Sequence, residues 1–208
     1  RRQRQMCIRD RIIGGVLAVA VPSVLIFLSI VMQEGQTLIK DYQRNRIMAF
    51  FDPATYADTE AYQQLNSVIA IGSGQLWGKG LNNTDIASVK NGNFLPESQT
   101  DFIFAIIGEE LGFIGSAVVI LLLILIAMRC VSIARVAKDT AGMVIAAGIG
   151  ALIGIQGFMN IAVATMMMPN TGLPLPFVSY GLSSLVSMYI GIGFVLNVGL
   201  QRKNLYNF

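Results

Sequence analysis

Long apolar runs separated by shorter polar segments dominate the hydropathy pattern of this chain of 208 residues. A helix that crosses the hydrocarbon core of a bilayer needs about 20 mostly apolar residues. Four runs reach that length, and they are Ile12–Met32, Phe102–Met128, Met143–Thr165 and Leu182–Leu200. The first run follows a basic stretch, but it is longer than the apolar core of a cleaved signal, which favours an anchoring helix. The pattern predicts an all-α polytopic membrane protein with four transmembrane helices, forming a single membrane domain over residues 1–208.

The composition agrees with this prediction. Hydrophobic residues make up 54% of the chain and charged residues only 13%, whereas about 25% of the residues of a soluble domain are charged. A soluble globular domain, a disordered chain and a coiled coil are therefore excluded. With no His and only two distant Cys (Cys7 and Cys130), the chain has neither the spacing of a zinc site nor a disulfide framework. Proton transfer would have to use a carboxylate, Lys, Tyr or a group of the substrate.

The basic residues predict the orientation of the helices. Ten of the 15 Lys and Arg residues lie in the N-terminal arm, in the connection after the second run and in the C-terminal tail. The other five lie between the first two runs, where acidic residues outnumber them. Since cytoplasmic loops carry the excess of Lys and Arg, we expect both termini in the cytoplasm and an extracytoplasmic loop over residues 33–101. The basic residues adjoin apolar segments, so a nucleic-acid partner is not expected.

We expect the extracytoplasmic loop to lie along the membrane. Its part Thr37–Phe51 mixes apolar and basic residues before Asp52-Pro53, which predicts an interfacial helix. Leu65–Ile71 is apolar but too short to span, so it is re-entrant or interfacial. Four glycines around Trp77 follow and predict a turn-rich segment at headgroup level. A phosphate-cradling loop is the alternative, although the P-loop and dinucleotide patterns are both missing.

Three carboxylates lie near the start of the second apolar run. Asp101 stands where the loop becomes a helix. Its spacing from Ser98 resembles a capping box, which favours a helix cap over a catalytic role when spacing alone is considered. Glu109 and Glu110 lie further into the same helix, where an ionisable side chain either reaches back to the interface, caps a neighbouring element, or faces a cavity.

The last two runs contain uncharged polar groups. Gln156 and Asn160 are four residues apart and share one helical face, which favours interhelical hydrogen bonds over contact with a substrate. Three prolines within Pro169–Gly181 predict irregular backbone beside the membrane, and such backbone either lines a cavity or forms a plain turn. The hydroxyls of Ser179 and Tyr180 in this segment suit hydrogen bonds to a sugar or phosphate.

Several of these segments, taken in order, resemble the FtsW/RodA/SpoVE family of shape, elongation, division and sporulation proteins. The matching segments are Tyr42–Arg46 with Asp52-Pro53, Gly72–Gly80, Leu95-Pro96-Glu97 with Thr100–Phe104, Gly108–Gly112, Gln156–Asn160, and Leu175-Pro176-Phe177 with Ser179-Tyr180-Gly181. The resemblance covers most of the chain and corresponds to the C-terminal portion of a larger family fold. The family's Gly-Gly after Ser-Tyr is Gly181-Leu182 in this chain.

The resemblance implies an inverting peptidoglycan glycosyltransferase of the bacterial cytoplasmic membrane, which polymerises lipid II and releases undecaprenyl pyrophosphate. It implies a class B penicillin-binding protein as partner and admits a divalent cation, Mg or Mn, as cofactor. The essential Asp of the family motif corresponds to Asp101, which would act as the general base. Further candidates for substrate binding are Glu97, Thr100, Glu109, Gln156, Asn160, Ser179 and Tyr180. A lipid-linked precursor flippase and a non-catalytic scaffold for a penicillin-binding protein are the alternative functions.

Overall fold

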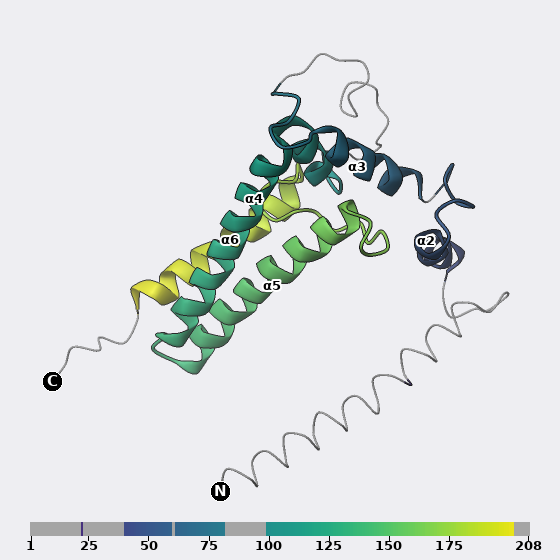
Figure 1. Cartoon of the computed structure of the whole chain (residues 1–208). Helices are drawn as coiled ribbons and strands as arrows, with labels where there is room; N and C mark the ends of the chain where they lie inside the picture. The colour runs from purple at the N-terminus through teal and green to yellow at the C-terminus, as the bar shows by residue number, and fades with distance from the viewer. Residues whose placement is uncertain (1–21, 23–39, 60, 82–98, 202–208) are drawn as a thin grey trace, which may run out of the picture. The chain divides into compact units, whose positions relative to one another are not determined.

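A computed structural model of the chain describes residues 22, 40–59, 61–81 and 99–201, and it is helical throughout these residues apart from turns and loops. The chain divides into two compact units, residues 1–48 and residues 49–208. The described helices are α2 (Asp41–Phe51), α3 (Tyr62–Ser73), α4 (Ile103–Arg135), α5 (Thr140–Ala164) and α6 (Leu182–Leu200). Figure 1 shows that α4 and α5, which both belong to the second unit, run side by side.

Three of these helices are long and apolar enough to cross a membrane. They are α4, α5 and α6, and they correspond to the last three runs predicted from the sequence. The prediction of an all-α polytopic membrane protein is therefore confirmed. The first predicted run, Ile12–Met32, lies outside the described residues except for Pro22, so the number of four helices stays a prediction.

Residues of the predicted extracytoplasmic loop form two shorter helices. α2 ends at Phe51, directly before Asp52-Pro53, since proline cannot continue a helix. α3 covers and extends the apolar stretch Leu65–Ile71, and its 12 residues are too few to span a bilayer.

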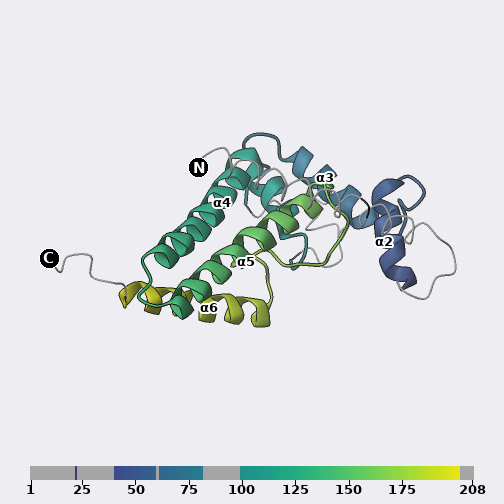
Figure 2. The same ribbon diagram turned by 90° about the horizontal axis from the view of Figure 1, so that it is seen from below.

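Small residues allow α4, α5 and α6 to approach one another closely. A Cβ added at Gly150 would lie 2.9 Å from the Cβ of Cys130 on α4, and one at Gly154 would contact Ala127. On the other side of α5, Ile149 packs against Gly191 of α6. Gly150 and Gly154 therefore have a packing role, because close helix approach in membranes depends on small residues. Figure 2 shows the three helices from a second direction.

The C-terminal end of α5 is tied to α3 by side chains. Gln64 Nε2 donates to the carbonyls of Val163 and Met168 at 3.0 and 2.8 Å. Ser67 Oγ, one turn further along α3, donates to the carbonyl of Ala164 at 2.8 Å. The last carbonyls of a helix have no partner within the helix, and Ser67 satisfies that of Ala164, the last residue of α5. The carbonyl of Val163 also accepts from the amide of Met166 at 3.1 Å, so Gln64 adds a second bond there.

Candidate functional site

Asp101 lies in the second unit, two residues before α4, and its side chain is partly exposed. The N-cap residue of α4 is Phe102, whose ring is almost completely buried. This differs from the capping box expected from Ser98 and Asp101, in which Ser98 would be the N-cap; Ser98 itself lies outside the described residues. The buried Phe102 ring anchors the start of α4 and leaves Asp101 at the edge of the packed helices.

The main chain of Gln99–Asp101 is held by three successive hydrogen bonds. The amide of Tyr180 donates to the carbonyl of Gln99 at 2.9 Å. The hydroxyl of Ser179 donates to the carbonyl of Thr100 at 2.6 Å, and Asn160 Nδ2 donates to the carbonyl of Asp101 at 2.7 Å. Two separate parts of the chain, α5 and the loop before α6, therefore fix the backbone position of Asp101.

The proline-rich loop 169–181 is held in place by polar side chains. Gln156 Nε2 donates to the carbonyl of Pro174 at 2.9 Å, and Asn160 Nδ2 also donates to that of Leu173 at 2.6 Å. The amide of Leu175 donates to Ser179 Oγ at 2.7 Å. Gln156 and Asn160 do act from one face of α5, as their spacing predicts, but these hydrogen bonds go to backbone carbonyls of loops, not to another membrane helix.

α4 is not a continuous helix, and this break was not predicted from the sequence. Gly112 has φ 66° and ψ −164°, a conformation that is essentially restricted to glycine. The part after Gly112 is about 35 Å long at 1.5 Å per residue, enough to cross a hydrocarbon core of ~30 Å. The shorter part before it carries Glu109, and Asp101 lies two residues before its first residue.

The glycine-rich segment 74–80 fills this break. The amides of Phe113 and Ile114 donate to the carbonyls of Gln75 and Leu76, at 2.8 and 3.3 Å. In return, the amides of Lys79 and Gly80 donate to the carbonyls of Glu109 and Glu110, at 2.9 and 3.0 Å. Backbone groups freed by the break are thus satisfied inside the protein, as a low-dielectric environment requires.

Glycines are needed where the segment 74–80 meets α4. A Cβ at Gly74 would overlap the carbonyl of Gly108, and one at Gly78 would overlap that of Glu110. Several amides of the segment, including those of Lys79 and Gly80, donate to carbonyls. The structure therefore supports the predicted turn-rich segment, and the amides of Lys79 and Gly80 bind α4 in place of a phosphate.

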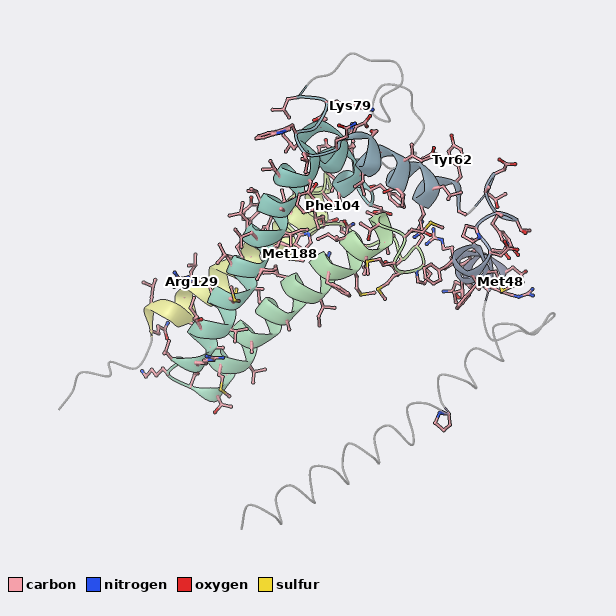
Figure 3. The ribbon with its side chains drawn as sticks, viewed as in Figure 1. Met48, Tyr62, Lys79, Phe104, Arg129 and Met188 are labelled. Atoms are coloured by element: carbon pink, nitrogen blue, oxygen red, sulfur yellow. The ribbon has the colours of Figure 1, made fainter. Side chains whose placement is uncertain are left out.

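Glu109 is buried, with 1% of its surface exposed, and forms an ion pair with Lys79. Lys79 Nζ lies 2.8 Å from Glu109 Oε1, and a quarter of the Lys79 side chain is exposed. Figure 3 shows Lys79 near one end of α4 and Arg129 near the other. Lys79 was not predicted as a site residue from the sequence. The signal that could have indicated it is a glycine-rich segment followed by an apolar run that contains Gly112.

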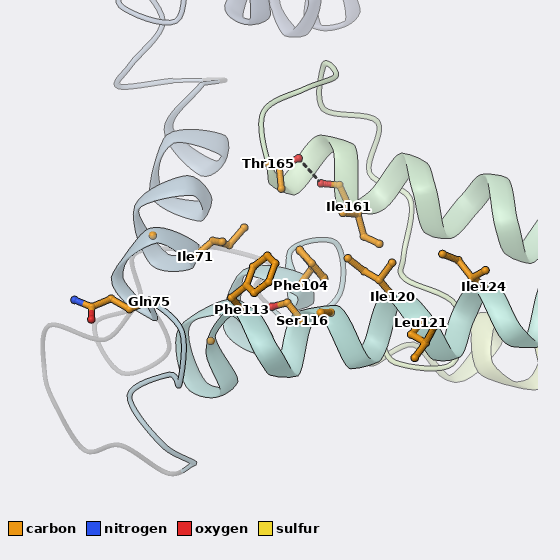
Figure 4. Close-up of a pocket in the computed structure, with 13 residues that line it drawn as sticks. Ile71, Gln75, Phe104, Phe113, Ser116, Ile120, Leu121, Ile124, Ile161 and Thr165 are labelled. Carbon is orange, nitrogen blue, oxygen red and sulfur yellow. Dashed lines mark hydrogen bonds between the residues drawn. The ribbon is translucent and has the colours of Figure 1, made fainter.

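A cavity of about 590 Å³ lies among α3, α4 and α5. Figure 4 shows its mostly apolar lining, which includes Ile71, Phe104 and Ile120, and the hydroxyl of Thr165, which donates to the carbonyl of Ile161. Ser116 Oγ, which also lines it, is buried and has no hydrogen-bond partner in the described part of the chain. Phe104 lines the cavity one turn after Asp101, whose own side chain is not part of the lining.

The predicted site residues fall into two groups. Asp101, Thr100, Asn160, Ser179 and the backbone of Tyr180 come together, whereas Glu109 belongs to the helix break. The side chain of Tyr180 is 75% exposed, and Glu97 lies outside the described residues. The substrate-binding role of all these residues stays a prediction.

The described residues do not supply a ligand set for a divalent cation. Among residues 22, 40–59, 61–81 and 99–201 there is no group of three or more His, Cys, Asp or Glu side chains able to hold a metal. The divalent cation implied by the family resemblance therefore stays a prediction.

Comparisons with known proteins match most of the chain. The family model described as "Cell cycle protein", FtsW/RodA/SpoVE, matches residues 10–204. A "Probable peptidoglycan glycosyltransferase FtsW" of Geobacter metallireducens is 40% identical over 163 residues, covering 78% of this chain and 42% of the relative. The "Peptidoglycan glycosyltransferase MrdB" of Escherichia coli K12 is 41% identical over 168 residues, covering 81% and 45%.

A solved structure is also similar. One chain of the structure described as "Structural coordination of polymerization and crosslinking by a peptidoglycan synthase complex" has a TM-score of 0.66 and 28% identity, and the match covers 94% of this chain and 50% of that one. The present chain thus spans less than half of the length of the two curated relatives named above.

Proposed function

Because this chain belongs to the FtsW/RodA/SpoVE family of integral inner-membrane proteins, we propose that it forms part of a peptidoglycan glycosyltransferase that polymerises lipid II. The observation that carries the proposal is the fixed backbone of Asp101 beside the loop 169–181. A carboxylate held at the edge of membrane helices can reach a saccharide whose lipid anchor remains in the bilayer. The relatives' printed names give the reaction class.

The proposed chemistry follows from the position of Asp101. A sugar hydroxyl of one substrate attacks the anomeric carbon of the lipid-linked donor, and the Asp101 carboxylate accepts the hydroxyl proton. The new glycosidic C–O bond forms as the bond from the anomeric carbon to the pyrophosphate breaks, so the configuration inverts. A general base requires hydrogen-bond reach to the proton that it removes, and the three bonds to Gln99–Asp101 restrict where this carboxylate can lie.

The orientation of the chain and its partner belong to the same proposal. Lys79 lies near one end of α4, whereas Arg129 lies near the other and Arg135 close to its C-terminus. Under the positive-inside rule, the Arg129 end faces the cytoplasm and the Asp101 end faces outward, with both termini cytoplasmic. The similar solved chain comes from a synthase complex in which polymerization is coordinated with crosslinking. This supports a class B penicillin-binding protein as the partner.

Asp101→Asn tests the proposal in the protein as the cell makes it, purified in lipid nanodiscs with lipid II as substrate. We expect glycan-strand formation to fall by about 10²- to 10⁴-fold, the usual contribution of a general base. The matched control is Asp139→Asn, because Asp139 caps α5 by accepting from the amide of Gly142 and Asn caps equally well. That control should retain the wild-type rate.

Two outcomes would contradict the proposal. Full polymer yield from Asp101→Asn would remove Asp101 from the catalytic mechanism. A wild-type protein that makes no polymer would refute the enzyme itself: if it moves labelled lipid II across the bilayer it is the flippase, and if it only binds the penicillin-binding protein it is the scaffold.

A further inference from the structure

Asn160 is the side chain that joins the Asp101 segment to the loop 169–181. It lies on α5 and is 1% exposed. Its single amide nitrogen donates to two carbonyls, that of Asp101 at 2.7 Å and that of Leu173 at 2.6 Å. These two carbonyls lie far apart in the sequence, so Asn160 fixes their separation at the place where Asp101 leaves the loop and enters α4.

The chemistry of a carboxamide suits this double contact. The two hydrogens of its planar NH₂ group diverge, so they can satisfy two acceptors from one rigid atom. An Asp side chain of the same shape is an acceptor when ionised and could not replace it. Without Asn160, these two carbonyls would each lose a donor, and leaving such a group unsatisfied is costly.

Ser179 makes a second connection of the same kind. Its hydroxyl donates to the carbonyl of Thr100 at 2.6 Å and accepts from the amide of Leu175 at 2.7 Å. Asn160 and Ser179 therefore hold adjacent carbonyls of the Asp101 segment, and both are about 1% exposed. The two side chains reach this segment from different elements, which restrains its rotation as well as its translation.

We propose that Asn160 is a positioning residue for Asp101, with Ser179 as its second support, and that neither side chain contacts the substrate. This inference rests on the proposed function, since it assigns Asn160 a role in placing the proposed base. Both hydrogens of the Asn160 amide already serve the protein. A displacement of about 1 Å in a reacting group can lower a rate by about 10²-fold, so loss of this amide changes the rate of chemistry without removing a binding contact.

The test compares Asn160→Ala with Gln64→Ala in the protein as the cell makes it. Gln64 is a matched control, because it is also a carboxamide with 1% exposure that donates to two backbone carbonyls. Its partners are Val163 and Met168, outside the Asp101 segment. Both variants lose two hydrogen bonds from a buried side chain, and Ser179→Ala provides a milder change if Asn160→Ala does not fold.

Three measurements distinguish positioning from other roles. We expect Asn160→Ala to lower kcat for lipid II polymerisation by about 10- to 100-fold with little change in KM, and with the pH at half-maximal kcat unchanged because Asp101 is still present. The amide of Tyr180, which donates to Gln99, should exchange its hydrogen faster in Asn160→Ala and Ser179→Ala. Folded Gln64→Ala should keep both the wild-type kcat and the slow exchange at Tyr180.

Each contrary result has a distinct meaning. A raised KM with kcat intact would overturn the inference in favour of direct substrate contact by Asn160. Equal losses of kcat in Asn160→Ala and Gln64→Ala would overturn it in favour of a general packing effect. A wild-type kcat and unchanged exchange in Asn160→Ala, beside an inactive Asp101→Asn, would reject the positioning role but retain the proposed enzyme. Full activity of Asp101→Asn would instead reject the proposed function.

Discussion

Replacing Lys79 by Met should destabilise the protein more than replacing both members of the Lys79–Glu109 pair by uncharged residues. Met keeps most of the aliphatic stem of Lys79 and the backbone bond from residue 79 to the carbonyl of Glu109. The change therefore removes one charge from a pair whose acidic partner is 1% exposed. A charged group costs much more to bury without its counter-charge than an uncharged amide does.

The magnitude follows from the geometry. The two charged atoms are 2.8 Å apart, which corresponds to an attraction of about 6 kcal/mol at an effective dielectric constant of about 20. Desolvation offsets much of this attraction, and breaking a buried pair typically costs about 3–5 kcal/mol. A quarter of the Lys79 side chain is exposed, so we expect Lys79→Met to lose about 3 kcal/mol.

The companion variants should lose less. Glu109→Gln leaves Lys79 able to extend toward water, and we expect it to lose about 1 kcal/mol. The double variant Lys79→Met with Glu109→Gln removes both charges, and we expect it to lose about 1–2 kcal/mol. The coupling energy between the two positions is then about 2–3 kcal/mol in a double-mutant cycle.

The assay is denaturant unfolding of the full chain in mixed micelles, followed by far-ultraviolet circular dichroism and extrapolated linearly. Lys138→Met is the control, because Lys138 lies after α4 in the connection to α5 and such surface changes usually stay within about 0.5 kcal/mol. If the double variant is no more stable than Lys79→Met, the ion pair does not stabilise the filled break in α4, and the reasoning fails.

Two further predictions concern the glycine at the break and a carboxylate outside the membrane helices. Gly112→Ala should cost at least about 3 kcal/mol in the same unfolding assay, because it adds a Cβ 2.7 Å from the carbonyl oxygen of Leu76 at a positive φ. The control is Gly72→Ala, which should not destabilise the protein because a Cβ there meets nothing within 4 Å. An equal loss of stability in both variants would refute this prediction. The hydroxyl of Thr55 donates to Asp52 Oδ2 at 2.6 Å. This bond is the main cause, and the bond from the Thr55 amide the second cause, of a pKa of Asp52 below its usual 3.8. Thr55→Val should therefore raise that pKa in an NMR titration. Because the folded pKa is lowered, this bond's contribution to stability is present above the unfolded pKa and is lost as pH falls through the folded value; an unchanged pKa in Thr55→Val would contradict the assignment.

Several features of the fold could be predicted from the sequence because they depend on local pattern. A run of about 20 apolar residues specifies a membrane helix wherever its partners lie, and α4, α5 and α6 coincide with three such runs. Pro53 ended α2 where expected, since proline lacks an amide hydrogen for the helix. The four-residue spacing of Gln156 and Asn160 correctly placed both side chains on one face of α5.

The partners of those side chains could not be predicted in the same way. Asn160 lies 59 residues from Asp101 in the sequence, and no local pattern indicates which distant carbonyl a buried amide will bind. Ser98 and Asp101 have the spacing of a capping box, yet α4 has Phe102 as its N-cap, because burial of the Phe102 ring competes with local capping.

By itself, the sequence determined that this protein is a helical membrane protein, which segments are able to cross the bilayer and which family motifs it carries, since the solvent preference of each segment is a property of its own residues. Only the tertiary structure decided that α4 is broken at Gly112, that the segment 74–80 fills the break, and that α5 and the loop 169–181 hold Asp101. The physical reason is that backbone groups in a low-dielectric environment must find partners, and when those partners lie far away along the chain, folding is what selects them.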